Sequence, residues 1–420
     1  MKLRLTIALS TACLAAAPAL ADKAAVLDNY ADIALAKYED SLITGQRLQS
    51  AVNALIAKPS GEALQAARQA WLAARVPYQQ TEVYRFGNAI VDDWEGKVNA
   101  WPLDEGLIDY VDAAYGGATD ENEYAALNVI ANPSFSLSGQ TIDAAKITPA
   151  LLEGQLHEAD EIESNVATGY HAIEFLLWGQ DLNGHGAGAG NRPWTDYAVG
   201  EACTGEYCER RGAYLKAATD LLVSDLEWMV AQWQLGGDAH TQVMADENAG
   251  ISTILTGMGS LSYGEQAGER MKLGVMLNDP EEEHDCFSDN THNSHFYDAM
   301  GIRNVYLGSY TRIDGSVISG PSLSSLVAET AADVDAELTA KLNATMLEMA
   351  EMKAAAEAGF AYDMMLERGN AQGEALIMGA VNALVDQTLS IERAITAPGV
   401  VAEIAFEGSD SLDDPEAVFQ

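Results

Sequence analysis

The stretch TGYHAIEFLLWGQD, residues 168–181, places a histidine and a glutamate in front of several large apolar side chains. His171 and Glu174 are three residues apart, so on a helix both side chains project from one face. In helix-bundle metal proteins, an imidazole and a carboxylate at this spacing bind iron or manganese together with ligands from facing helices. The same pair can also be a hydrogen-bonded structural contact at the edge of a helix. From this stretch alone, both interpretations remain open.

Further candidate ligands occur in both halves of the chain. The stretch EEEHDCFSDNTHNSHFYDAMG, residues 281–301, holds three of the seven histidines and several carboxylates. A solvated turn is the alternative interpretation for that stretch, and a structural ion pair with Arg85 is the alternative for the acids of the first half. The second-half candidates are His284, His292, His295 and Asp298, and the first-half candidates are Glu82, Asp104 and Glu105.

The elements that must position these residues are predicted to be helices. Apolar residues recur every three or four positions in most long segments, whereas alternating β-branched runs are rare. The chain is therefore expected to be all-α. Three segments rich in Gly, Pro, Asn and other polar residues are expected to be irregular: 87–148, 180–197 and 278–310. The expected helices cover residues 24–57, 60–86, 148–179, 206–234, 239–277, 321–358 and 373–394.

The N-terminus has the pattern of an export signal. Lys2 and Arg4 precede an apolar stretch that ends in Ala19-Leu20-Ala21, so residues 1–21 are predicted to be cleaved and the protein to act in the periplasm or cell envelope. No later apolar run reaches the length of about 20 residues that a membrane helix needs. The formal net charge of −40 excludes nucleic acid as a partner, because phosphate binding requires clustered Lys and Arg.

The cysteines and the missing catalytic motifs limit the chemistry further. Cys203 and Cys208 are close enough for a local disulfide in an oxidising compartment, which would leave Cys286 as a free thiol; the sequence alone leaves the pairing open. The stretch HEADE has Glu161 where a zinc peptidase would have its second histidine. The chain also contains no G-x-S-x-G nucleophile motif.

Three stretches resemble a known family. GYHAIEFLLWG carries the G-x-H-x-x-E motif of the imelysin-like family at Gly169, His171 and Glu174, without departure from the pattern. The stretches RVPYQQTEVYRFGNAIVDDWEGKVNAWPLDEGLIDYV and HDCFSDNTHNSHFYDAMGIRNVYLG resemble its long-chain branch, iron-regulated protein A. The resemblance covers nearly the whole mature chain. It implies two helical-bundle domains that arose by duplication, at residues 22–200 and 201–420, with the motif at the cleft between them.

The resemblance also implies a function in iron uptake alongside a membrane iron-uptake system. His171 and Glu174 would then be metal ligands, for iron first and for manganese or zinc as alternatives. Because a ligand imidazole must be neutral, binding is expected to weaken as the pH falls through the ordinary histidine range. The family carries a peptidase label, so a metal-dependent peptidase is one alternative. A cleft that binds a peptide or haem between Trp101, Tyr170 and Trp178 is another.

Overall fold

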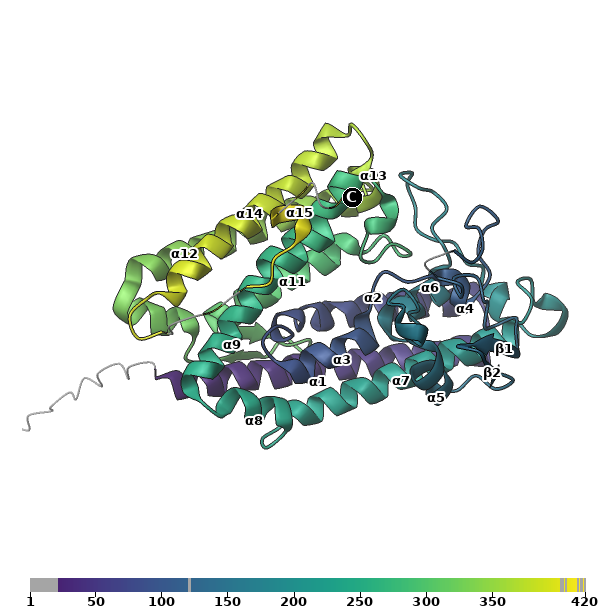
Figure 1. Ribbon diagram of the computed structural model, residues 1–420, viewed down its shortest axis with the longest axis horizontal. Coiled ribbons are helices and arrows are strands. Elements are labelled where there is room, and N and C mark those ends of the chain that lie inside the picture. The colour runs from purple at the N-terminus through teal and green to yellow at the C-terminus, as the bar shows by residue number, and fades with distance from the viewer. Residues whose placement is uncertain are drawn as a thin grey trace, which may run out of the picture.

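Helices make up most of the structure, which confirms the all-α prediction, and the strands of the described residues form two short hairpins. The computed structural model describes residues 22–119, 122–400, 404, 406–413, 415 and 418. The predicted signal peptide, residues 1–21, lies outside the described residues. Figure 1 shows two groups of helices, one along the long axis of the molecule and one inclined above it.

The first group is built around the long helix α1. Helices α2 and α7 pack along α1, and α6 packs against α2, α3 and α7. The turn between α1 and α2 follows from its sequence: Pro59 cannot continue a helix, and the Ser60 hydroxyl caps α2 by accepting from the Ala63 N–H at 3.1 Å. The helices of this group are α1 (Lys23–Ala57), α2 (Gly61–Gln79), α3 (Ala89–Asn99), α6 (Gly169–Trp178) and α7 (Cys208–Trp233).

The second group consists of the helices that follow α8. Helices α12 and α14 pack on each other, α11 packs on α12, and η6 packs on α14. Methionines are prominent in its own core, which contains Met271, Met349, Met352 and Met365. The elements of this group are α9 (Glu247–Ser260), η6 (Leu261–Lys272), α10 (Leu273–Leu277), α11 (Thr291–Leu307), α12 (Leu323–Glu357), α13 (Tyr362–Leu366) and α14 (Ala371–Ile395).

The main hydrophobic core continues from the first group into the second. It includes Trp71 of α2 and Leu226 of α7 as well as Ile302 of α11 and Leu338 of α12. Helix α7 follows residue 200 in the sequence, yet it packs on α1. A domain boundary at residue 200, an origin by duplication and a cleft between the domains stay predictions.

Five expected segments differ from those observed. Helix α3 lies within 87–148, which was expected to be irregular, and the expected helix over 148–179 is divided into α5 (Pro149–Leu151), η2 (Leu152–Leu156), η3 (Ala159–Glu161) and α6. Helix α2 ends at Gln79, two residues after Pro77, and a 3₁₀ turn, η1 (Glu82–Tyr84), follows it. The expected helix over 239–277 is divided into α8, α9, η6 and α10, and η6 is a π-helical segment of 12 residues. The expectation of an irregular segment at 278–310 is wrong, because most of it is the 17-residue helix α11. The buried positions in the first half of α11 are largely polar, so the segment lacks an apolar periodicity.

Short elements make up the rest of the described secondary structure. The strands pair as antiparallel hairpins, with Phe135 opposite Ile142 in one and Tyr310 opposite Ile318 in the other. Cys203 and Cys208 form a disulfide, and Cys286 is the free cysteine of the described residues. None of the described helices is long and apolar enough to span a membrane. The short elements are α4 (Glu105–Ile108), α5 (Pro149–Leu151), η2 (Leu152–Leu156), η3 (Ala159–Glu161), η4 (Trp194–Tyr197), η5 (Gly200–Ala202), α8 (Asp238–Met244), η7 (Pro280–Glu282), α15 (Asp410–Asp413), β1 (Ser134–Leu137), β2 (Gln140–Asp143), β3 (Ser309–Thr311) and β4 (Val317–Ser319).

Candidate metal centre

Helix α6 carries the histidine and the glutamate of the G-x-H-x-x-E motif, and every one of its residues is buried. Its first residue, Gly169, has a φ of +79°, and a Cβ at this position would lie 2.5 Å from the carbonyl oxygen of Val98. Only glycine fits both the left-handed backbone and the close approach of α3. The indole N–H of Trp71 donates to the carbonyl oxygen of Tyr170 at 2.9 Å and holds the start of α6 against α2. The backbone conformation and the contact with α3 therefore explain why the first position of the motif is glycine.

His171 and Glu174 contact each other, as their spacing predicts. The distance between His171 Nδ1 and Glu174 Oε2 is 3.0 Å. The other oxygen of Glu174, Oε1, accepts from the backbone N–H of Ser288 at 3.0 Å and from its hydroxyl at 2.6 Å. In the tautomer that donates Nδ1–H to Glu174, the lone pair of His171 lies on Nε2, which has no hydrogen-bond partner. Glu174 thus orients the imidazole and ties α6 to the segment at 283–290.

Two residues of that segment complete a compact donor set. One ligand atom each from His171, His284 and Asp285 lie within 4.8 Å of one another, and all three residues are buried. The rings of His171 and His284 meet edge to face, with centroids 4.8 Å apart. His171 Nδ1 lies 4.0 Å from Asp285 Oδ1. Two imidazoles and a carboxylate form a nitrogen and oxygen donor set that suits first-row transition metals.

Asp285 is held by a fixed set of donors. Arg75 of α2 donates from Nη2 to Oδ1 at 2.7 Å, and the Arg75 Nη1 donates to Asn99 at 2.6 Å. Asn290 donates to Oδ2 at 2.8 Å, and the Ser294 hydroxyl donates to the same oxygen. Burial alone would raise the pKa of Asp285, but Arg75 and these donors outweigh it and the pKa is lowered. Asp285 is therefore an ionised, well-oriented carboxylate.

The histidines of this region are held neutral by their surroundings. Burial, reinforced by the cation of Arg75, lowers the pKa of His171 to about 3. Burial also lowers the pKa of His284 well below its usual value, and the nearby Arg270, His171 and Arg75 add to the effect. Burial and the charge of Asp285 raise the pKa of Glu174. A neutral imidazole is the form that binds metal, so both rings are in the required state at neutral pH.

A second polar network contains three of the other candidates. Arg270 of η6 donates to Glu82 at 2.8 Å and to Asp298 at 3.1 Å, and it forms an ion pair with Glu265 at 2.7 Å. His295, from the same face of α11 as Asp298, is fully buried, and neither ring nitrogen has a hydrogen-bond partner. Glu82 and Asp298 are thus engaged by Arg270, while His171, Glu174 and His284 come together elsewhere.

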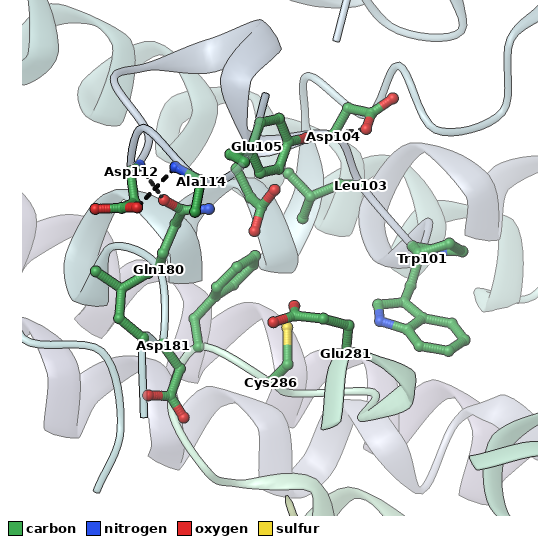
Figure 2. Close-up of a pocket in the computed structure, with 14 residues that line it drawn as sticks. Trp101, Leu103, Asp104, Glu105, Asp112, Ala114, Gln180, Asp181, Glu281 and Cys286 are labelled. Atoms are coloured by element: carbon green, nitrogen blue, oxygen red, sulfur yellow. Dashed lines mark hydrogen bonds between the residues drawn. The ribbon is translucent and has the colours of Figure 1, made fainter. Parts of the chain in front are cut away.

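The remaining candidates lie outside the compact set. Asp104 accepts hydrogen bonds from Tyr115 at 2.9 Å and from Ser164 at 2.7 Å, and Asn122 also donates to it. Asp104 and Glu105 both line a pocket of about 370 Å³, which Figure 2 shows. His292 approaches Asn293, with 3.0 Å between His292 Nε2 and Asn293 Nδ2. Each was a plausible ligand by residue type, but among the residues that the structure describes, the group whose ligand atoms lie close enough to hold an ion is His171, His284 and Asp285.

Four contributors were not singled out from the sequence: Arg75, Asn99, Asp285 and Ser288. Asp285 directly follows His284, which is the one local signal that could have identified it. Arg75 and Asp285 are 210 residues apart, so their contact has no local signature. The haem-binding alternative placed Tyr170 in the wall of a cleft, but this side chain is fully buried. Trp101 and Trp178 line two adjoining pockets instead.

Comparison with known proteins identifies the family. The family model described as Imelysin matches residues 34–391, which is most of the chain. The chain belongs to the imelysin family. This imelysin-family chain is 38% identical over 58 residues to "Iron-regulated protein A" of Synechococcus elongatus, a match that covers 14% of this chain and 16% of that protein.

Two solved structures share the fold of this imelysin-family chain. One is a putative iron-regulated protein A precursor from Parabacteroides distasonis, with a TM-score of 0.63, 18% identity, and coverage of 91% of this chain and 96% of the other. The second is an imelysin-like protein from Psychrobacter arcticum 273-4, with a TM-score of 0.55, 16% identity and coverage of 89% and 94%. At these identities, the likeness shows the fold.

Proposed function

We propose that this protein binds a transition-metal ion, iron in the first place, at His171, His284 and Asp285, and acts in iron uptake outside the cytoplasm. The observation that carries the proposal is the convergence of these three residues within 4.8 Å. They come from α6 and from the segment before α11, which are separate parts of the chain. The names of the relatives, which include an iron-regulated protein A, support iron as the cargo.

The donor set fits a metal ion by its chemistry. His171 Nε2 and His284 Nδ1 are buried ring nitrogens without a hydrogen-bond partner. Leaving a buried polar group unpaired costs about 1–3 kcal/mol, so an ion that engages the lone pair of His171 Nε2 would remove this cost. The lone pair of the neutral His284 ring lies on Nε2, which faces the amide donor of Asn99 at 3.4 Å, and Nδ1 carries the proton in that tautomer. The contact of Glu174 with His171 matches the carboxylate–histidine arrangement that orients metal ligands. We therefore propose that His171, His284 and Asp285 bind the ion and that Glu174 positions His171.

The peptidase alternative has less support. A metal-dependent peptidase needs a carboxylate that is free to activate water, whereas both oxygens of Glu174 are engaged, Oε2 by His171 and Oε1 by Ser288. The exposed fraction of the His171 and His284 side chains is 1% and 2%, so a peptide bond would not reach them without rearrangement. A single ion reaches such a site more easily than a polypeptide does.

The test is the metal content of protein purified from the periplasm without a metal-binding tag. Elemental analysis of the wild type is expected to show close to one ion per chain. His171→Gln and His284→Gln should each lose most of the metal, because each removes a ligand nitrogen while keeping a similar volume. His240→Gln is the matched control, because His240 lies on α8 and is not part of the donor set. Circular dichroism and a thermal melt show whether each variant keeps its fold.

The outcomes separate a metal site from a structural contact. Metal in the wild type and in His240→Gln, but not in the two site variants, supports the proposal. A wild type that is metal-free and takes up no Fe(II), Mn(II) or Zn(II) on reconstitution would return His171 and Glu174 to a structural role. Equal metal content in all four proteins would place the ion elsewhere.

A further inference from the structure

A pocket of about 370 Å³ lies next to the metal centre and is strongly acidic. Figure 2 shows Glu105 and Glu281 reaching into it from opposite walls, with the thiol of Cys286 beside Glu281. No lysine or arginine is among its lining residues. The lining residues are Trp101, Pro102, Leu103, Asp104, Glu105, Asp112, Ala114, Tyr115, Gln180, Asp181, Leu182, Glu281, Cys286 and Phe287.

The inner wall of this pocket is also the outer wall of the metal centre. Trp101 packs its ring edge to face with His284, with centroids 5.7 Å apart. Cys286 and Phe287 directly follow Asp285 in the chain and line the pocket. A single layer of side chains therefore separates the pocket from His284.

A buried carboxylate lies next to His284 in the chain. Glu283 is 1% exposed, and its Oε2 has no hydrogen-bond partner. Asp363 is 2% exposed, and neither of its oxygens has a hydrogen-bond partner. Carboxyl groups thus extend beyond the pocket lining, which includes Asp181.

The sign of this field selects among forms of the metal. A cleft lined by one sign of charge raises the local concentration of oppositely charged solutes and their association rates by about 10- to 1,000-fold. A hydrated divalent cation is attracted, whereas a metal complexed by citrate or another polycarboxylate carries negative charge and is repelled. Five of the residues that line the pocket carry a carboxyl group: Asp104, Glu105, Asp112, Asp181 and Glu281.

We infer that this acidic pocket is the entrance through which free hydrated metal cations, and not anionic metal chelates, reach His171 and His284. The inference rests on the proposed function and names its substrate class. Trp101 and Cys286 lie on the path between the pocket and the donor set. The metal is delivered as an aquo ion, which exchanges its water ligands for the two imidazoles and Asp285.

The test measures association rates with Co(II), which reports binding through its visible absorption. The entrance variant Glu281→Gln/Asp112→Asn removes two charges at exposed positions and keeps the side-chain shapes. Glu227→Gln/Glu374→Gln removes the same charge from exposed positions on α7 and α14 and is the matched control. At about 20 mM salt the entrance variant should bind Co(II) roughly 3- to 10-fold more slowly than the control, and at about 0.5 M salt the two rates should converge. Glu281→Lys should slow Co(II) further.

A second arm compares free metal with ferric citrate by equilibrium dialysis. We expect Co(II) to bind to the wild type and ferric citrate to leave iron outside the protein. Equal rates for the entrance variant and the control at low salt, or binding of ferric citrate as tight as that of Co(II), would overturn the inference while the metal site itself stands. If the wild type binds no Co(II) at all, the proposed function fails and the inference with it.

Discussion

The buried ion pair between Arg75 and Asp285 should be the most costly single interaction of the metal centre to break. The exposed fractions of the two side chains are 1% and 0%, and Arg75 Nη2 lies 2.7 Å from Asp285 Oδ1. Removing one partner of a buried pair leaves an uncompensated charge, at a cost of about 3–5 kcal/mol. Arg75→Met should therefore lower the free energy of unfolding by this amount, since the Asp285 carboxylate keeps only the neutral donors Asn290 and Ser294.

A double-mutant cycle separates the pair from other effects of the substitutions. Asp285→Asn should also destabilise the protein, by about 2–4 kcal/mol, because it leaves the Arg75 cation buried. The double variant Arg75→Met/Asp285→Asn should be more stable than the sum of the single changes predicts, by about 1.5–3 kcal/mol. Urea unfolding followed by circular dichroism measures all four free energies. Additive effects within about 0.5 kcal/mol would show that the two charges are not coupled, and the description of Asp285 given above would be refuted.

Three further predictions follow from the same contacts. The free energy of unfolding should fall as the pH drops from about 6.5 towards 3. The reason is that unfolded histidines take up protons near pH 6.5, whereas the pKa of His171 and of His295 is about 3 in the folded chain. Urea midpoints at pH 7, 6, 5 and 4 measure this, and a pH dependence of the midpoint that is unchanged in His171→Gln would contradict it. Gly169→Ala should cost at least about 2 kcal/mol, and Gly139→Ala, with a φ of +71° but nothing within 4 Å of the added Cβ, should cost less; equal losses would remove the steric argument. Mn(II) at about 100 times its Kd should stabilise the wild type by about 2.7 kcal/mol and leave the melting temperature of His171→Gln unchanged, and an equal rise in both would place the bound ion elsewhere.

The structure also revises the expected pH dependence of metal binding. The ordinary pKa of histidine predicts that affinity weakens between pH 7.5 and 5.5. Because the pKa of His171 is about 3, its imidazole stays neutral through this range. Binding should therefore persist at pH 5.5 and be lost only at a lower pH. A flat affinity between pH 7.5 and 5.5 is thus compatible with histidine ligands.

The sequence by itself determined the features that depend on neighbouring residues. The helical spacing of His171 and Glu174 predicted their contact, because positions three apart share one face of a helix. The short separation of Cys203 and Cys208 made a local disulfide plausible, and the structure contains it. The repeat of apolar residues every three or four positions predicted α1, α12 and α14 closely, since these helices bury an apolar face.

Only the tertiary structure decided which distant residues meet. Arg75 and Asp285 are 210 residues apart, and Glu82 meets Arg270 across 188 residues. Helix α11 escaped detection because its inward face is largely polar and is stabilised by partners such as Arg270, which lies outside the segment 278–310. A periodicity of apolar residues records burial against a hydrophobic core, but a buried polar face depends on donors and acceptors that folding brings from elsewhere. For this reason the sequence identified His171, Glu174 and His284 of the candidate metal centre, and only the fold added Asp285 and its partner Arg75.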